Sequence, residues 1–339
     1  MKKLSIILTF VMLLFLLCCS KEKSIRVAAI QMNCQLGELD TNLTNAEKFI
    51  REAFEQNAEL VILPEFFTTP GYGFSYNPKV LEAVCPLNGK PMQLLKKLSQ
   101  EYNGIVGGSF IAFHGKDTYN SFVLAFPDGT YFIHNKDYPT GLENCYYTGG
   151  ADDGVFETPI GNIGVALCWE FVRTGTAKRL LDRVDIVIGG SCWPLPIDPE
   201  DWPKDDSPSL LQSTPSQFAR LVGVPVVHTN HVGEVRYFSE EDPTKNHARS
   251  YGGETQIVDG FGNIIERFSY KDGEGILFAD VVLGKVDGPT EPIPDRFWIP
   301  ELQEDTQKFW KDALTGPFRK YYEETALRYY LKKWSDKNP

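Results

Sequence analysis

Glu65, Lys136 and Cys168 occupy equivalent places in the sequence pattern, because each follows a short apolar segment. Their side chains have complementary chemistry. A cysteine attacks as the thiolate, a carboxylate can accept the thiol proton, and an ammonium stabilises the negative charge of a tetrahedral intermediate. The three residue types therefore predict nucleophilic catalysis by a thiol that needs no histidine. Taken singly, each residue also fits an ordinary role, Cys168 as a core cysteine and the other two as solvated charges.

The segments that precede these residues have the character of buried strands. Apolar runs cover Leu60–Leu63, Thr130–Asn135 and Ile163–Leu167, and a short run of this kind between turn residues is typical of a buried strand. If the three strands lie in neighbouring layers and run in one direction, their carboxyl ends place the three reactive side chains at one rim. After Cys168 the pattern predicts a turn and then a helix over Thr174–Asp182. Such a turn exposes the sulfur to backbone N–H groups that stabilise negative charge.

Further helices and strands alternate along the rest of the chain. Helices are predicted over Asn42–Gln56, Met92–Tyr102 and Leu210–Val222. Strands are predicted over Ile25–Met32, Gly104–Phe113, Tyr119–Phe126, Asp185–Gly190, Pro225–Asn230, Gly253–Val258, Asn263–Phe268 and Ile276–Val282. This mixture of hairpins and crossover connections indicates layered sheets with helices outside them, in one domain over residues 24–288. Residues 289–339 are predicted to form a C-terminal helical packing arm, which docks either on its own domain or on a neighbouring subunit.

The acidic composition argues against a nucleic-acid partner. The chain of 339 residues carries a formal net charge of -11, whereas phosphate recognition needs a basic surface. Beyond the first 19 residues the cysteines have irregular spacings, which indicate neither a disulfide framework nor a zinc site. These cysteines are Cys34, Cys85, Cys145, Cys168 and Cys192. His228 and His231 lie across a strand end rather than on a helix face, so both are interpreted as structural and no metal is expected.

Residues 1–19 have the pattern of an export signal. A dibasic start precedes the apolar run Leu4–Leu17, which is too short to span a bilayer comfortably and is followed by Cys18 and Cys19. Cleavage before a cysteine resembles the signal of bacterial lipoproteins. We therefore expect an exported protein that is anchored to a bacterial cell membrane, at the periplasmic face or the outer membrane, by a lipid on Cys19 or Cys18. An ordinary signal peptide or an uncleaved anchor is the alternative.

Further motifs surround the three reactive residues in a defined order. They are Val27-Ala28-Ala29-Ile30-Gln31-Met32, Leu63-Pro64-Glu65, Asn135-Lys136 with Pro139, Glu143 and Gly149, Leu167-Cys168-Trp169-Glu170, Val226-Val227-His228-Thr229-Asn230, and Ile257-Val258-Asp259-Gly260-Phe261-Gly262. This order resembles that of the nitrilase superfamily of carbon-nitrogen hydrolases across Ile25–Val282. Several motifs in the family's order are a specific signal, whereas any one of them would be weak.

The resemblance implies a four-layer alpha-beta-beta-alpha sandwich of the carbon-nitrogen hydrolase type. By this resemblance Cys168 is the nucleophile, Glu65 the general base and Lys136 the stabiliser of the oxyanion. Glu143 matches a second glutamate that many members carry beside the lysine, and the N–H of Trp169 is the expected second donor to the oxyanion. The resemblance also implies dimers or larger homo-oligomers, and we expect neither a metal nor an organic cofactor.

The expected substrate is a small amide or N-carbamoyl compound. Cys168-Trp169-Glu170 looks like the true-nitrilase branch, which makes a small nitrile the alternative substrate. However, Gly141 and Asn144 stand where that branch usually has His and Arg, and these departures favour amides or carbamoyl compounds. A catalytically inactive binding lipoprotein of the same fold is a competing class, against which the intact set of reactive residues argues.

Two aromatic-rich loops are expected to wall the substrate pocket. Their candidate substrate-binding residues are Phe66, Tyr72 and Trp193, and surface packing is the ordinary role for each. Arg173 follows the nucleophile closely and could hold a substrate carboxylate. The ordinary role for this arginine is a surface ion pair.

Overall fold

The computed structural model describes residues 23–70, 76–195, 197, 207–238 and 246–334. The predicted export signal, with Cys18 and Cys19, lies outside these residues, and so does Tyr72. Among the described residues, no helix is both long enough and apolar enough to cross a membrane.

Two mixed β-sheets form the centre of the molecule. In spatial order, the first sheet contains β15 (Gly275–Val282), β1 (Ser24–Gln31), β2 (Leu60–Ile62), β4 (Ile105–His114), β5 (Asp117–Ala125) and β6 (Tyr131–Asn135), and β3 (Cys85–Pro86) pairs with β4. The second sheet contains β10 (Pro194–Leu195), β13 (Asn246–Val258), β11 (Val226–Asn230), β9 (Ile186–Ser191), β8 (Gly161–Leu167) and β7 (Val155–Thr158), and β12 (Val232–Phe238) and β14 (Ile264–Ser269) pair with β13.

The strands that lead to the reactive residues share one direction. β1, β2 and β4 are parallel, and β5 runs antiparallel to both β4 and β6, so β2 and β6 point the same way. In the second sheet β8, β9 and β11 are parallel. A parallel bridge between Met32 and His231 joins the residues that directly follow β1 and β11. The carboxyl ends of β2, β6 and β8 therefore lie at the same edge of the two sheets.

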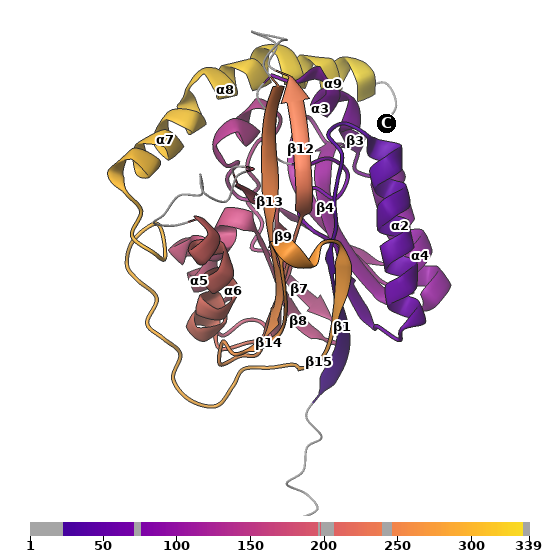
Figure 1. Cartoon of the computed structure of the whole chain (residues 1–339), viewed down its shortest axis with the longest axis vertical. Helices are drawn as coiled ribbons and strands as arrows, with labels where there is room; N and C mark the ends of the chain where they lie inside the picture. Colours follow the sequence, from indigo (N-terminus) through magenta and orange to yellow (C-terminus); the bar gives the residue numbers. More distant parts are fainter. Residues whose placement is uncertain (1–22, 71–75, 196, 198–206, 239–245, 335–339) are drawn as a thin grey trace, which may run out of the picture.

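Helices cover the outer face of each sheet. α2 (Leu39–Glu55) and α4 (Lys90–Tyr102) cover the first sheet, and α5 (Thr174–Leu180) and α6 (Ser207–Val222) cover the second. In Figure 1 these two pairs lie on opposite sides of the strands. The short helix α3 (Pro78–Ala83) precedes β3. The structure thus confirms the predicted alpha-beta-beta-alpha sandwich.

The side chains of β1 show how the layers are held together. Ala28 and Ile30 belong to the buried cluster under α2 and α4, whereas Val27 and Ala29 belong to the cluster between the two sheets. Because successive side chains of a strand point to opposite faces, a strand buried on both faces must be apolar at nearly every position. This explains why the inner strands appear in the sequence as continuous apolar runs.

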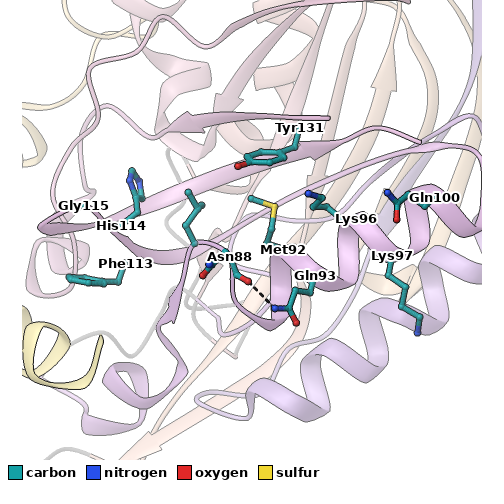
Figure 2. Close-up of a pocket in the computed structure, with 11 residues that line it drawn as sticks. Asn88, Met92, Gln93, Lys96, Lys97, Gln100, Phe113, His114, Gly115 and Tyr131 are labelled. Carbon is teal, nitrogen blue, oxygen red and sulfur yellow. Dashed lines mark hydrogen bonds between the residues drawn. The ribbon is translucent and has the colours of Figure 1, made fainter. Parts of the chain in front are cut away.

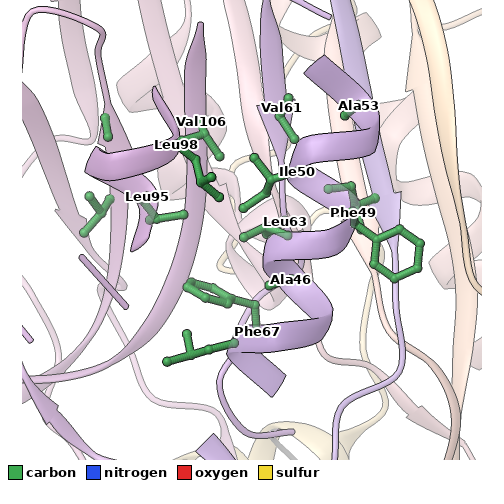
Figure 3. Packing of buried hydrophobic residues seen from close by; sticks show 14 of the residues in the cluster. Ala46, Phe49, Ile50, Ala53, Val61, Leu63, Phe67, Leu95, Leu98 and Val106 are labelled. Atoms are coloured by element: carbon green, nitrogen blue, oxygen red, sulfur yellow. The ribbon is translucent and has the colours of Figure 1, made fainter. Parts of the chain in front are cut away.

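α2 packs on the first sheet through one apolar face. Ala46, Phe49, Ile50 and Ala53 recur at helical spacing and are buried near Val61 of β2 (Figure 3). Side chains three and four positions apart share a face of a helix, so the pattern alone dictates which face is buried. Truncation of a core side chain such as Ile50 to alanine costs about 2–5 kcal/mol of stability.

The C-terminal arm, predicted over residues 289–339, is helical from Glu304 onward in the described residues, and residues 289–303 lead to it without a helix. It contains α7 (Glu304–Thr315), α8 (Pro317–Tyr321), a π-helical turn over Tyr322–Ala326, and α9 (Leu327–Trp334). The arm docks on the domain of its own chain, across one end of the sheets in Figure 1. Tyr322 is fully buried there, where its hydroxyl accepts a hydrogen bond of 3.1 Å from the N–H of Thr118 and donates one of 2.8 Å to Asp117.

The predicted strands and helices are present, with shifted ends and some additions. The main difference is that β13 begins at Asn246, seven residues before the predicted start at Gly253, because its first half pairs with β12 over Val232–Phe238. β3, β7, β10, β12 and α3 were not predicted. β3 and β10 contain two residues each, and an element of that length has no periodicity to detect.

Candidate active site

Cys168 lies at the turn between β8 and a short 3₁₀ helix over Cys168–Val172. Its φ is +50°, a left-handed conformation that non-glycine residues rarely adopt and that is often found at functional sites. The N–H of Leu167 donates a hydrogen bond of 2.8 Å to Oε2 of Glu170, three residues on. The side chain of Glu170 therefore holds the turn that presents the sulfur. The cysteine itself is only 5% exposed.

Glu65 is held by donors from three separate parts of the chain. Its Oε1 accepts hydrogen bonds of 2.9 Å from Nζ of Lys136 and from Nδ2 of Asn120, and its Oε2 accepts one of 2.9 Å from the N–H of Cys192. The next residue, Phe66, has a φ of +56°, and its N–H donates a hydrogen bond of 3.1 Å to Oγ of Ser109. The chain therefore turns sharply after Pro64 and fixes the carboxylate in one orientation.

Lys136 lies between two carboxylates. Its Nζ donates hydrogen bonds of 2.9 Å to Glu65 Oε1 and to Glu143 Oε2, and its side chain is fully buried. Glu143 is held in turn by the N–H of Thr140, at 2.7 Å, and by the hydroxyl of Tyr147. A charged hydrogen bond on each side fixes the position of the ammonium.

Burial sets the protonation states of these groups. It raises the pKa of Glu65 to about 7, against the opposing effect of Lys136 and with a smaller raising effect from Glu143. Burial also raises the pKa of the Cys168 thiol, and the negative charge of Glu65 raises it further, while Lys136 acts in the opposite sense. For Lys136, burial lowers the pKa, but Glu143 and Glu65 outweigh that effect and raise it well above the ordinary value. The site therefore holds a protonated thiol, a carboxyl group that is partly ionised near neutral pH, and a permanent cation.

The structure brings Glu65, Lys136, Glu143 and Cys168 together, as the strand directions require. Trp169 and Trp193 stack beside the cysteine, with ring centroids 5.1 Å apart and planes 18° from parallel. Phe66 is fully buried, with its ring centroid 5.9 Å from Nζ of Lys136. Phe66 thus packs beneath the ammonium, whereas the two tryptophans line the cavity next to the sulfur.

Arg173 contacts residues other than those that surround the sulfur of Cys168. Its guanidinium pairs with Asp137 and lies over the rings of Tyr138 and Phe297, 4.3 and 5.0 Å from their centroids. The side chain of Arg173 is 6% exposed. This arrangement is a buried ion pair between aromatic rings, and it does not direct the guanidinium into the cavity beside Cys168.

Three polar contacts of the site were not predicted from the sequence. Asn120 and the N–H of Cys192 hold Glu65, and Tyr147 holds Glu143. Asn120 lies in the middle of a strand and carries no motif. Cys192 follows β9 directly, and β9 is parallel to β8, so its place just beyond a strand end was the one signal available.

A second buried network surrounds Glu170. His134 Nε2 lies 3.0 Å from Glu170 Oε2, Nη2 of Arg179 donates to Glu170 Oε1 at 3.2 Å, and the N–H of Asp137 donates to the same oxygen at 3.1 Å. Burial raises the pKa of Glu170, but the charges of His134 and Arg179 outweigh burial and bring it well below the ordinary range. Burial lowers the pKa of His134, but Glu170 and Asp152 outweigh it and raise the pKa to about 9. This network is therefore ionised at neutral pH.

A cavity of about 350 Å³ opens beside Cys168. It is lined by Thr140, Gly141, Leu142, Glu143, Cys168, Trp169, Cys192, Trp193, Pro194, Leu210, Leu302, Thr306 and Phe309. Its size suits a small molecule, and most of its wall is apolar or aromatic. Among the described residues, no group of three or more His, Cys, Asp or Glu side chains is placed to hold a metal ion. The described cysteines are all free thiols.

A larger groove, of about 900 Å³, lies on α4 and the β4–β5 hairpin (Figure 2). Its lining includes Met92, Lys96, His114 and Tyr131, and Nζ of Lys96 lies 4.9 Å from the ring centroid of Tyr131. The groove contains none of Glu65, Lys136 and Cys168. Size alone therefore does not identify the site, and the smaller cavity is the candidate because it holds the nucleophile.

Comparisons with known proteins point to one family. The family model described as carbon-nitrogen hydrolase matches residues 26–288. The chain is 30% identical to a nitrilase of Pyrococcus abyssi over 53% of this chain and 69% of that protein. It is 28% identical to the omega-amidase NIT2 of Mus musculus, over 79% and 92% of the two chains, and 27% identical to the N-carbamoylputrescine amidase of Solanum lycopersicum, over 78% and 89%.

A solved structure shares the fold. The carbon-nitrogen hydrolase from Helicobacter pylori G27 superposes with a TM-score of 0.63 at 20% identity, over 77% of this chain and 90% of that one.

Proposed function

The chain belongs to the carbon-nitrogen hydrolase family, and we propose that it hydrolyses the carbon-nitrogen bond of a small amide or N-carbamoyl compound. The family works through a cysteine acyl-enzyme. The observation that carries the proposal is the position of Lys136, with one carboxylate on each side and a protonated cysteine beside them. This arrangement keeps the cation charged and leaves one of the two carboxylates, Glu65, able to exchange a proton near pH 7.

In the first half-reaction, Sγ of Cys168 attacks the carbonyl carbon while Glu65 takes the thiol proton. The carbon-sulfur bond forms as the carbonyl π electrons move to oxygen, where Nζ of Lys136 and the N–H of Trp169 stabilise the negative charge. The tetrahedral intermediate collapses when Glu65 returns its proton to the nitrogen. Ammonia or an amine then leaves, and the acyl group stays on the sulfur as a thioester.

In the second half-reaction, Glu65 takes a proton from water, which attacks the thioester carbon. Lys136 again stabilises the oxyanion, because the pairing with Glu143 keeps it charged and in place. The carbon-sulfur bond breaks, the acid leaves, and Cys168 recovers its proton from Glu65. Glu65 therefore acts alternately as base and acid, which its pKa of about 7 suits.

Nitrile hydrolysis is the second candidate, supported by the relative from Pyrococcus abyssi that is named nitrilase. Asn144 bears on this choice. Its Nδ2 donates hydrogen bonds of 2.9 Å to the carbonyl of Gly141 and 3.2 Å to that of Pro139, so it holds the loop before the cavity. Gly141 lines the cavity without a side chain, and Asn144 is buried behind it, so neither position supplies the His or the Arg that the true-nitrilase branch usually has there.

A panel of matched substrates separates the candidates. Primary amides, N-carbamoyl amino acids and the corresponding nitriles are incubated with the purified protein, and the ammonia released is measured. We expect turnover of amides or carbamoyl compounds, and a loss of at least about 10⁴-fold in Cys168→Ala. Turnover of nitriles with the amides untouched would overturn the amide proposal, and full activity of Cys168→Ala would overturn the mechanism.

We also propose that the protein is an exported lipoprotein. The support is the leader composition, with an apolar run that ends at Cys18 and Cys19. In bacteria that express the full chain, palmitate label should enter the protein and be lost when both cysteines are replaced by alanine. Label that persists in the double variant would contradict this proposal.

A further inference from the structure

Part of the wall beside Cys168 comes from outside the region that the family model matches. Leu302, Thr306 and Phe309 line the cavity, whereas the matched region ends at residue 288. Thr306 and Phe309 belong to α7. In Figure 1 a long connection leads from β15 to α7 at the opposite end of the molecule. The C-terminal arm therefore contributes to the site after the chain has completed both sheets.

Phe309 fills the space beside the backbone of Gly141. A Cβ at position 141 would lie 2.7 Å from Cε1 and 2.8 Å from Cζ of the Phe309 ring, distances that real Cβ atoms essentially never show. Gly141 also has a φ of +51°, in the left-handed region that favours glycine. The aromatic ring from the arm thus takes the place of a side chain that position 141 lacks. This gives Gly141, one of the departures from the true-nitrilase branch, a structural reason.

The residue after Phe309 anchors α7 to the nucleophile turn. Trp310 is 3% exposed, and its ring centroid lies 5.6 Å from that of Trp169 and 4.8 Å from that of Trp298. Trp169, which directly follows Cys168, also stacks on Trp193, which lies between β9 and β10. The arm and the turn that carries the sulfur therefore pack as one unit.

Backbone hydrogen bonds reinforce this packing. The N–H of Ile299 donates to the carbonyl of Val172 at 2.6 Å, and the N–H of Thr174 donates to the carbonyl of Phe297 at 3.2 Å. These bonds join the segment before α7 to the end of the nucleophile turn. Phe309 itself is 47% exposed, although its neighbour is buried. An anchored helix thus presents an open aromatic face at the rim of the cavity, where a bound ligand would cover it.

The charge of the lining excludes some substrates. Among the described residues that line the cavity, Glu143 is the one charged side chain, and Lys136 neutralises it. Arg173, the nearest arginine to the nucleophile in sequence, is held by Asp137. A substrate whose acyl chain carries a carboxylate would lose the hydration of that group in this cavity, and the described lining offers no cation in return. Burying an unpaired charge in this way is costly. An apolar acyl group would instead cover aromatic surface.

We propose that the C-terminal arm selects the acyl group, with Phe309, Trp169 and Trp193 binding the apolar acyl chain of an uncharged primary amide. This inference rests on the proposed hydrolysis of amides, and it makes Phe309 a specificity-determining residue. In this proposal Phe309 takes no part in the cleavage of the carbon-nitrogen bond, which Cys168 and Glu65 carry out. Loss of one good apolar contact in a binding pocket changes discrimination by about 10–200-fold.

The test compares phenylacetamide, acetamide and succinamate as substrates of the full chain. We expect wild-type protein to prefer phenylacetamide to succinamate. The measured quantity is kcat/KM for phenylacetamide divided by kcat/KM for acetamide. Phe309→Ala should lower this ratio by about 10-fold or more, and Phe309→Leu should give a ratio between those of wild type and Phe309→Ala. Phe261→Ala is the matched control, because Phe261 is also exposed, at 57%, and lies in the turn after β13. This control should leave the ratio unchanged.

Binding gives a readout that does not depend on turnover. Phenylacetamide is titrated into Cys168→Ala and into Cys168→Ala/Phe309→Ala, with the fluorescence of the tryptophan cluster as the signal. We expect the second protein to bind about 10-fold more weakly or worse. The inference would be overturned by any of three results. These are equal affinity of the two proteins, an unchanged substrate ratio in Phe309→Ala, and a wild-type preference for succinamate. Weakened binding without hydrolysis of any amide would uphold it and contradict the proposed function instead.

Discussion

Two buried glutamates near the same cysteine differ in their protonation. Glu65 and Glu170 are each 1% exposed. Glu65 receives one cation, Lys136, which it shares with Glu143. Glu170 receives two cations, His134 and Arg179, and two backbone N–H groups as well. The two carboxyl groups are equally buried, so what separates their pKa values is the balance of neighbouring charges, one cation and a second carboxylate beside Glu65 against two cations beside Glu170.

The difference appears in their protonation. For Glu65, burial dominates and raises the pKa to about 7, so the carboxyl group can gain and lose a proton during a reaction. For Glu170, the two cations outweigh burial, and the pKa falls well below its ordinary range. Glu170, the fixed anion, positions the turn that carries Cys168, whereas Glu65, the carboxyl group that titrates near pH 7, is the base of the proposed mechanism. A buried carboxyl group can therefore exchange a proton near neutral pH only when the nearby cations do not fully offset the effect of burial on its pKa.

The largest expected effect is the loss of activity in Glu65→Gln. Glutamine keeps the shape of the side chain but cannot accept the thiol proton, so kcat/KM should fall by about 10³-fold or more. Thermal unfolding should show that the fold is retained. A variant that keeps more than a tenth of the wild-type kcat/KM would contradict the role of Glu65 as base.

The next effect is a loss of stability in Glu170→Gln. Removing one partner from a buried ion pair leaves His134 and Arg179 incompletely compensated, which costs about 3–5 kcal/mol of unfolding free energy. Urea unfolding measures this cost, and Glu157→Gln is the matched control, because Glu157 is exposed on β7 and should change stability by less than about 0.5 kcal/mol. Equal stabilities of the two variants would remove the structural role of Glu170.

The pH dependence of this stability has a definite sign. The pKa of His134 is raised from 6.5 to about 9 in the folded protein. Its contribution to stability is therefore fully present below pH 6.5 and is lost as the pH rises through about 9. The stability difference between wild type and His134→Gln should shrink over that window, and a difference that grows with pH would contradict the assignment.

The smallest of these effects is the acid limb of the pH-rate profile. Because the free enzyme needs ionised Glu65 to accept the thiol proton, kcat/KM should fall about tenfold per pH unit below about pH 7. The profile is measured with an uncharged amide, so that the substrate does not titrate in this range. A limb at the ordinary glutamate pKa would show that burial does not control this carboxyl group.

Much of the candidate site could be placed from the sequence. A strand end is visible as an apolar run followed by a polar residue, and Glu65, Lys136 and Cys168 each occupy such a place. Their convergence depends on a common strand direction, which the sheet pairings provide. The four-layer fold followed from the order of the motifs and agrees with the solved relative.

Contacts between distant elements could not be predicted in this way. His134 and Glu170 are 36 residues apart, and their pairing depends on how the two sheets lie against each other. Asn120 and Glu65 are 55 residues apart, and their pairing depends on the order of the strands within the first sheet. The packing of Phe309 on Gly141 joins the arm to a loop of the domain. A sequence pattern reports local burial and periodicity, and it contains no information on such placements unless a motif supplies it.

The most direct test of the contrast between the two glutamates is a ¹³C NMR titration of protein labelled at the glutamate side-chain carboxyl carbon. One signal, absent from Glu65→Gln, should titrate with a midpoint near pH 7, as burial of Glu65 requires. The signal absent from Glu170→Gln should keep the shift of an ionised carboxylate from pH 5 to 8. A Glu65 signal that stays ionised throughout this range, or a Glu170 signal that titrates within it, would contradict the division of roles between them.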